Sequence, residues 1–237
     1  LSHTSGKILT LYGDNTYING NGFPAPGTPG DANRIEAGTE IGSFYIWKFA
    51  GFDDEGGFLL YNKDGEVIPA ADKDEADKQY IGNYTPSLIV GWNHTFQYKN
   101  FDLGINMRSW IDFDVYNTLD MYYGIQGKGD INVLKSAYSK YNHIKGEKML
   151  CDYWLQDGTF LKIDAITLGY TLDAKKFSNK MIDRIRIYGT VGNVCTITGY
   201  DGMDPEVDVM GVEGGIEWWD GFYPRTRTYT LGVQLTF

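Results

Sequence analysis

The last ten residues of the chain alternate between apolar and polar side chains without a break. Tyr229, Leu231, Val233, Leu235 and Phe237 fall on one face of an extended chain, and small or polar residues fall on the other. A period of two is that of a β-strand whose faces meet different surroundings. The apolar face either packs on a second sheet, as in a soluble sandwich, or meets lipid in a membrane barrel. Residues 228–237 alone leave both structures open.

The composition favours strands and turns over helices. Of the 237 residues, 15% are aromatic, and the chain has 18 Tyr and 30 Gly. Tyrosine suits strands, whereas glycine suits turns. No apolar run approaches the roughly 20 residues of a membrane-spanning helix. Barrel strands are apolar only at alternate positions, so a membrane barrel remains compatible with this sequence.

The net charge and the cysteine content argue against nucleic-acid-binding proteins and disulfide-rich proteins. The formal net charge of −10 argues against nucleic acid as a partner, because phosphates require Lys and Arg. Cys151 and Cys195 are too few for a disulfide framework, and the sequence does not decide whether they pair. The chain begins at Leu1 with no initiator Met and no signal peptide. For a chain with envelope-like strands, this predicts a fragment or a processed piece.

The clearest hairpin is predicted around Lys99 and Asn100. Apolar residues share one face on both of its arms: Leu88, Val90, Trp92, Phe96 and Tyr98 before the turn, and Phe101, Leu103, Ile105, Met107, Ile111 and Phe113 after it. Each arm has about a dozen residues, more than the roughly 5–6 of an ordinary strand and enough to cross a bilayer. The opposite face of the second arm is expected to line a lumen: Asp102, Asn106, Arg108 and Asp112.

Other strands are predicted along the chain, at residues 43–52, 58–61, 160–172 and 184–197, with the end of a short strand at 7–11. A helical piece is expected near 132–141, whereas the charged stretch 70–78 is expected to be a solvated loop. Short turns alternate with long loops at 116–157 and 198–225, an asymmetry typical of transmembrane barrels. About seven strands cannot enclose a wide lumen, so we expect part of a larger barrel.

Several motifs occur in one order along nearly the whole chain. They are Tyr98-Lys99-Asn100-Phe101-Asp102-Leu103, Gly158-Thr159-Phe160-Leu161-Lys162-Ile163, Gly199-Tyr200-Asp201-Gly202-Met203-Asp204-Pro205-Glu206-Val207, and the ending from Tyr223-Pro224-Arg225 to Phe237. In combination they resemble the C-terminal barrel of SusC/RagA-type TonB-dependent transporters. The sequence departs from that pattern at residues 217–221.

The resemblance implies an all-β fold: an antiparallel transmembrane barrel of about 22 strands in the outer membrane, with long extracellular loops. Residues 1–237 would be its C-terminal portion, without the plug domain and the TonB box. The implied function is active import of oligosaccharides or peptides, with a SusD-like surface lipoprotein as partner and the TonB complex acting through the missing N-terminal part. No enzyme activity and no cofactor are implied.

A soluble extracellular all-β module that binds glycans is the alternative function. The two hypotheses differ in the apolar strand faces, which would contact lipid in a barrel and be buried in a soluble module. A hydrolase, a third possibility, would need two carboxylates across a cleft, which sequence does not show. His3, His94 and His143 lack metal-ligand spacing, so no metal site is predicted.

The candidate substrate-binding residues are aromatic side chains in the long loops, together with one lumen-facing arginine. They are Trp218, Trp219 and Tyr223 in the last loop, Tyr122 and Tyr123 in the longest loop, and Arg108. Sugar rings stack on aromatic rings through their apolar C–H faces. The alternative role for each aromatic residue is a membrane-interface girdle or packing against the lipoprotein. Asp201, Asp204 and Glu206 are expected to form a turn scaffold in preference to a cation site.

Overall fold

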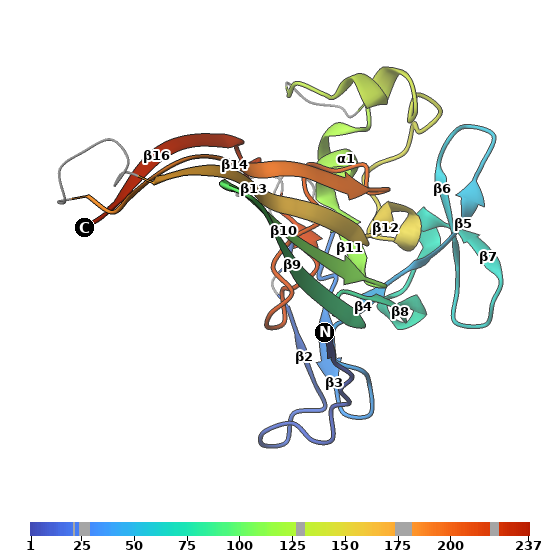
Figure 1. Ribbon diagram of the computed structural model, residues 1–237. Coiled ribbons are helices and arrows are strands. Elements are labelled where there is room, and N and C mark those ends of the chain that lie inside the picture. The colour runs from blue at the N-terminus through green and yellow to red at the C-terminus, as the bar shows by residue number, and fades with distance from the viewer. Residues whose placement is uncertain (21, 24–28, 127–130, 174–181, 219–222) are drawn as a thin grey trace.

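A six-stranded antiparallel sheet is the largest element of the computed structural model, which describes residues 1–20, 22–23, 29–126, 131–173, 182–218 and 223–237. Its strands, in spatial order, are β1 (Ser2–His3), β9 (Leu88–Tyr98), β10 (Phe101–Ile111), β13 (Phe160–Asp173), β14 (Arg184–Thr198) and β16 (Thr228–Thr236). They form a long curved ribbon (Figure 1). The four longest strand predictions are therefore confirmed, and the fold is all-β.

The predicted hairpin at Lys99 and Asn100 is also confirmed. Tyr98 pairs with Phe101, and the register continues without a shift to Leu88 opposite Ile111. Lys99 adopts a φ of 54°, which lies in the left-handed region that tight two-residue hairpin turns use. The turn therefore fixes which side chains of β9 and β10 share a face.

The strand registers align apolar residues into continuous rows on one face of the sheet. One row runs across five strands, from Val233 through Ile187, Tyr170 and Phe101 to Tyr98. The terminal strand is open on this face, with Leu231 89% and Val233 63% exposed. No second layer covers these residues in the described part of the chain, so the sandwich expected of a soluble module is not what this sheet forms.

A one-residue irregularity in β13 reverses its two faces. Asn106 pairs with Ala165 but Met107 pairs with Ile163, so Asp164 is an extra residue in the ladder, a β-bulge. Even-numbered residues such as Ile166 share the apolar face on one side of the bulge. On the other side Lys162 pairs with Arg108 on the opposite, polar face. The bulge thus places Lys162 beside Arg108.

The remaining elements gather at one end of the long sheet (Figure 1). The short strands are β2 (Tyr17–Asn19), β3 (Arg34–Glu36), β4 (Ser43–Ile46), β5 (Lys48–Phe52), β6 (Phe58–Tyr61), β7 (Val67–Pro69), β8 (Gln79–Asn83), β11 (Asp114–Asn117), β12 (Leu155–Asp157) and β15 (Ile216–Glu217). The helices are α1 (Thr118–Tyr123) and the 3₁₀ turns η1 (Ala70–Asp72), η2 (Glu75–Asp77), η3 (Lys135–Tyr138) and η4 (Asp152–Trp154). No helix among the described residues is long and apolar enough to cross a membrane.

These short elements enclose the main hydrophobic core. Its fully buried members include Phe44, Ile46, Leu60, Tyr116 and Trp154, none of which is more than 1% exposed. The residues come from four separate parts of the chain, so the long connections pack on one another. The high aromatic content of the sequence is used largely here.

Four local predictions were wrong or incomplete. The strand expected at 43–52 is two strands in different sheets, because the chain breaks at Trp47, whose side chain is buried. The strand expected at 7–11 is a single bridge from Lys7 to Glu40. The stretch 70–78 contains two 3₁₀ turns, and the helical piece near 132–141 is only η3. Helix α1, capped by Asn117, was not predicted.

Candidate functional site

Two basic side chains lie side by side on the polar face, near the folded end of the sheet. Arg108 of β10 is the register partner of Lys162 of β13. Residues 200–217, which we call the strap, run over them and end in β15. The bulge residue Asp164 accepts hydrogen bonds from Arg108 Nε at 3.0 and 2.9 Å. The strand register and the bulge therefore set the position of both cations.

Lys162 is the buried centre of an ion cluster. Its side chain is 2% exposed. Its Nζ donates to both carboxylate oxygens of Asp204, at 2.6 and 2.8 Å, and to Glu206 Oε2 at 2.7 Å. Both acceptors belong to the strap. The three donor positions of an ammonium group are thus all occupied by strap carboxylates.

Glu206 joins three cations. Arg108 binds it with two guanidinium nitrogens, Lys162 donates to it, and Arg225 Nη2 lies 3.0 Å from its Oε2. The whole cluster contains three bases and three acids: Arg108, Lys162, Arg225, Asp164, Asp204 and Glu206. Burial opposes ionisation of Glu206, but the hydrogen bonds from Arg108 and Lys162 outweigh burial and hold the pKa of its carboxyl below the usual value.

The carboxylate of Glu217 holds the other end of the strap. Its hydrogen-bond partners in the described part of the chain are a hydroxyl and two backbone N–H groups. Glu217 has no exposed surface. Its Oε2 accepts the hydroxyl of Tyr200 at 2.6 Å, and its Oε1 accepts the backbone N–H groups of Met203 and Asp204 at 2.7 and 3.3 Å. Burial raises the pKa of Glu217, and the nearby charge of Asp120 raises it further.

A small apolar cluster lies between the strap and the sheet. It consists of Phe113, Val115, Phe160, Tyr200 and Val207, with Trp110 packed against it. The strap supplies Tyr200 and Val207. Gly202 is required at its bend, because a Cβ there would collide with the Glu217 carboxylate and the Tyr200 ring. The motif from Gly199 to Val207 is therefore a scaffold that seats the strap, as the sequence favoured.

The structure disperses the predicted substrate-binding residues. Tyr122 is buried and Trp218 is partly buried, and both contact the ring of Phe23, at 6.5 and 5.4 Å between centroids. Tyr123 is partly buried against the same core. These packed rings leave little face for a ligand.

The remaining predicted residues lie elsewhere. Arg108 is bound in the ion cluster, with its side chain 27% exposed. Tyr223 is 82% exposed. Trp219 lies outside the described residues. No single site therefore unites the predicted set in the part of the chain that the structure describes.

Sequence reasoning missed Lys162 and Glu217. The apolar alternation of Ile166, Leu168 and Tyr170 would place Lys162 on the apolar face, and only the bulge at Asp164 moves it to the polar face beside Arg108. Glu217 lies where the sequence departs from the familiar pattern. No group of three His, Cys, Asp or Glu side chains that could hold a metal ion is found within the described ranges.

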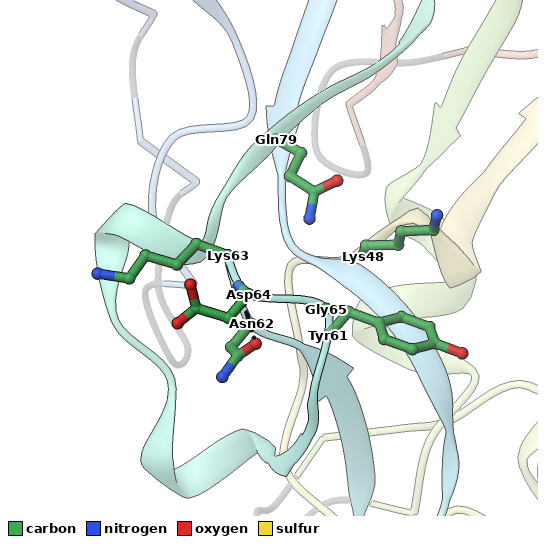
Figure 2. A pocket seen from close by; sticks show the side chains of 7 residues that line it. All are labelled: Lys48, Tyr61, Asn62, Lys63, Asp64, Gly65 and Gln79. Atoms are coloured by element: carbon green, nitrogen blue, oxygen red, sulfur yellow. Dashed lines mark hydrogen bonds between the residues drawn. The ribbon is translucent and has the colours of Figure 1, made fainter.

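A separate open hollow of about 440 Å³ lies between β5, β6 and β8. It is lined by Lys48, Tyr61, Asn62, Lys63, Asp64, Gly65 and Gln79. Figure 2 shows Lys48 and Lys63 pointing in opposite directions. Asn62 is occupied by its own turn, since its Oδ1 accepts the N–H groups of Asp64 and Glu66. The lining does not converge on one ligand position.

The chain is similar in sequence to TonB-dependent receptors. It is 24% identical to TonB-dependent receptor P3 of Formosa agariphila, over 100% of this chain and 26% of that protein. It is 28% identical to TonB-dependent receptor SusC of Bacteroides thetaiotaomicron, over 88% of this chain and 21% of that protein. No protein-family model matches. These relatives are named as receptors, not as enzymes.

Solved structures show the same fold. The RagAB peptide transporter matches with a TM-score of 0.76 at 22% identity, over 98% of this chain and 25% of that chain. The RagAB peptide importer in its closed-closed state matches with a TM-score of 0.72 at 21% identity. The chain spans about a quarter of the length of the proteins it matches. It is similar, as the motifs predicted, to a segment of SusC/RagA-type TonB-dependent transporters.

Proposed function

We propose that residues 1–237 form the C-terminal part of the barrel wall of an outer-membrane, TonB-dependent importer. The observation that carries this proposal is the apolar row from Val233 to Tyr98, which crosses five strands in register and is not covered. A continuous apolar face of this kind is costly in water but favourable in hydrocarbon. In a barrel wall, the apolar face of the sheet would meet lipid and the opposite, polar face would line the lumen.

The dimensions of the sheet support a membrane-spanning role. The strands β9, β10, β13, β14 and β16 have 9 to 15 residues, which matches or exceeds the roughly 9–11 that a tilted strand needs to cross a bilayer. The two-residue turn between β9 and β10 lies at one end of the sheet, and the folded connections lie at the other (Figure 1). Outer-membrane barrels have the same asymmetry, with the short turns on the periplasmic side.

The proposed substrates are oligosaccharides or peptides, delivered with a SusD-like surface lipoprotein. The support comes from similarity to proteins named SusC and RagAB peptide transporter. The plug and the TonB box would lie in the rest of the protein, through which the TonB complex would act. Of the proposed substrate-contacting residues, Tyr223 has the most available ring, and Trp219 remains a candidate. Tyr122, Tyr123, Trp218 and Arg108 would have to give up existing contacts to bind a ligand.

The lipid-facing assignment is tested by placing a lysine on each face of β16 in the full-length protein. We expect Leu231→Lys to reduce the heat-modifiable barrel in outer-membrane fractions, because a lysine on the lipid side costs about 2–4 kcal/mol near the bilayer midplane. The matched control is Thr230→Lys, on the opposite face of the neighbouring position. Equal assembly of the two variants would contradict the proposal. A stable monomer in detergent-free buffer would favour the soluble glycan-binding module.

Transport is tested separately in a strain that lacks the gene. This strain is grown on single oligosaccharides and on peptide mixtures. We expect it to fail to grow on one of the two nutrient classes, and we expect the wild-type gene to restore growth. Restoration should be lost when TonB is inactive. Undiminished growth of the deletion strain on every nutrient would count against import, whatever the position of the barrel wall.

A further inference from the structure

The strap is attached to the sheet by charges more than by apolar contacts. Between Pro205 and Gly214 only Val207 has a buried side chain in the small apolar cluster, and residues 208–213 are exposed or half-buried. The cluster of Arg108, Lys162 and Arg225 with the strap carboxylates is the connection in the middle of this segment. The strap would therefore respond strongly to changes in that cluster.

The two strap carboxylates do not depend equally on Lys162. Glu206 keeps Arg108 and Arg225 as partners if Lys162 is removed. Among the described cations, Asp204 keeps only Arg225, whose Nε is 3.7 Å from its Oδ2, together with the backbone N–H of Glu206 at 3.0 Å from its Oδ1. The side chain of Asp204 is 8% exposed. An almost buried carboxylate without a close cation is strongly unfavourable, so Asp204 would gain most by moving into water.

Water has a route to the cluster from one side. The side chain of Arg225 is 48% exposed, whereas that of Lys162 is 2% exposed. Arg225 therefore closes the outer edge and Lys162 fixes the inner edge. Beneath the strap lie Trp110, Phe113 and Phe160, whose rings are 5.5 to 6.3 Å apart. Movement of the strap would uncover these three rings.

We propose that the strap is a releasable cover, held closed by the hydrogen-bonded pairing of Lys162 with Asp204 and Glu206, and that its release exposes the aromatic trio Trp110, Phe113 and Phe160. The cover opens between Tyr200 and Gly211, while β10, β13 and β14 keep their pairing, β15 stays paired with β11, and Gly211 stays hydrogen-bonded to Tyr84. Its closed state depends on the inner cation, Lys162, more than on any surface ion pair. This device is independent of the transported substrate.

The test is amide hydrogen exchange on the full-length protein in detergent micelles. The variant Lys162→Met is compared with Lys140→Met, because Lys140 forms the other lysine pair with the strap, to Asp201 at 2.6 Å, with both side chains more than half exposed. We expect exchange at residues 201–210 to become on the order of a hundredfold faster in Lys162→Met, whereas β15 should keep the wild-type rate. Exchange in Lys140→Met should match the wild type, and β10 and β13 should be unchanged in both.

Two results would overturn the proposal. One is equal strap exchange in the Lys162→Met and Lys140→Met proteins. The other is a uniform increase through β10, β13 and β14, which would show general destabilisation. If Lys162→Met does not assemble, Arg225→Gln replaces it, and a smaller, strap-limited increase is required. The readout does not involve uptake, so loss of transport without faster strap exchange counts against the cover alone.

Discussion

The hydroxyl of Tyr200 donates a hydrogen bond of 2.6 Å to the carboxylate of Glu217, a side chain with no exposed surface. Both residues belong to the strap, one at each end. Glu217 also accepts two backbone N–H groups from the bend between them. The strap is thus closed on itself by one carboxylate and fixed to the sheet by another set of charges.

Replacing Glu217 by Gln should change how stability depends on pH. Burial raises the pKa of Glu217 in the folded state above the roughly 4.3 of an unfolded chain. Such a group contributes most to stability below its unfolded pKa, and that contribution is lost as the pH rises through the folded pKa. The melting temperature of Glu217→Gln relative to wild type should therefore rise between about pH 4 and pH 8. Thermal unfolding of the full-length protein in detergent measures this difference.

The exposed Asp72 provides the control for that experiment. The variant Asp72→Asn, which removes one exposed carboxylate, is measured over the same pH range. A difference for Glu217→Gln that falls with rising pH would contradict the assigned direction of the Glu217 shift.

Glu206 and Asp164 should differ in their contributions to stability. Glu206 pairs with three cations, and its side chain is 10% exposed, whereas Asp164 pairs with Arg108 and is 38% exposed. We expect Glu206→Gln to lower the free energy of unfolding by about 3–5 kcal/mol. Asp164→Asn should lower it by less than about 1 kcal/mol, because its ion pair is better solvated. Urea titrations of both variants provide the comparison, and equal losses would show that burial does not set their contributions.

Substitution by alanine should destabilise the protein at one glycine of the motif and have little effect at another. A Cβ on Gly202 would overlap Glu217 and Tyr200, whereas a Cβ on Gly199 would have no atom within 4 Å. We expect Gly202→Ala to destabilise the protein by about 1–3 kcal/mol. Gly199→Ala should change stability by less than about 0.5 kcal/mol. The same urea titration measures both, and a stable Gly202→Ala protein would show that the strap tolerates movement at its bend.

The terminal strand should be needed for membrane assembly. Leu235 and Phe237 are 46% and 78% exposed on the apolar face. The double variant Phe237→Ala with Leu235→Asn should reduce heat-modifiable barrel in the outer membrane, since in the proposed barrel the strand loses two side chains that face lipid. The control is Gln234→Ala with Thr236→Ala, on the other face. Normal barrel levels in the first variant would argue against lipid contact by these residues.

The sequence predicted the long strands because their alternation persists over many residues. Residues 160–172 and 184–197 were each within one residue of the observed β13 and β14. The short strands were harder, because β4 and β5 are continuous in sequence yet diverge at the buried Trp47. No local pattern indicates such a break, which is imposed by packing.

The candidate site was less predictable than the sheet. The loop aromatic residues were candidates for substrate binding, with packing as the alternative, and the structure shows Tyr122 and Trp218 packed with Phe23, which is distant in sequence. The ion cluster was missed because its members meet only through the strand register and through the path of the strap over β10 and β13. Lys162 and Asp204, for example, are 42 residues apart. Sequence periodicity assigns a side chain to a face of its own strand, but not to its neighbour across the sheet.

The bulge at Asp164 makes one strand serve two environments. If Asp164 were paired as an ordinary strand residue instead of bulging, the apolar alternation of Ile166, Leu168 and Tyr170 would continue to Lys162. In the proposed barrel, the ammonium group would then face lipid, and Phe160 would move away from its aromatic neighbours to the same face. The bulge therefore divides β13 into a stretch that continues the apolar face and a stretch whose lysine holds the strap.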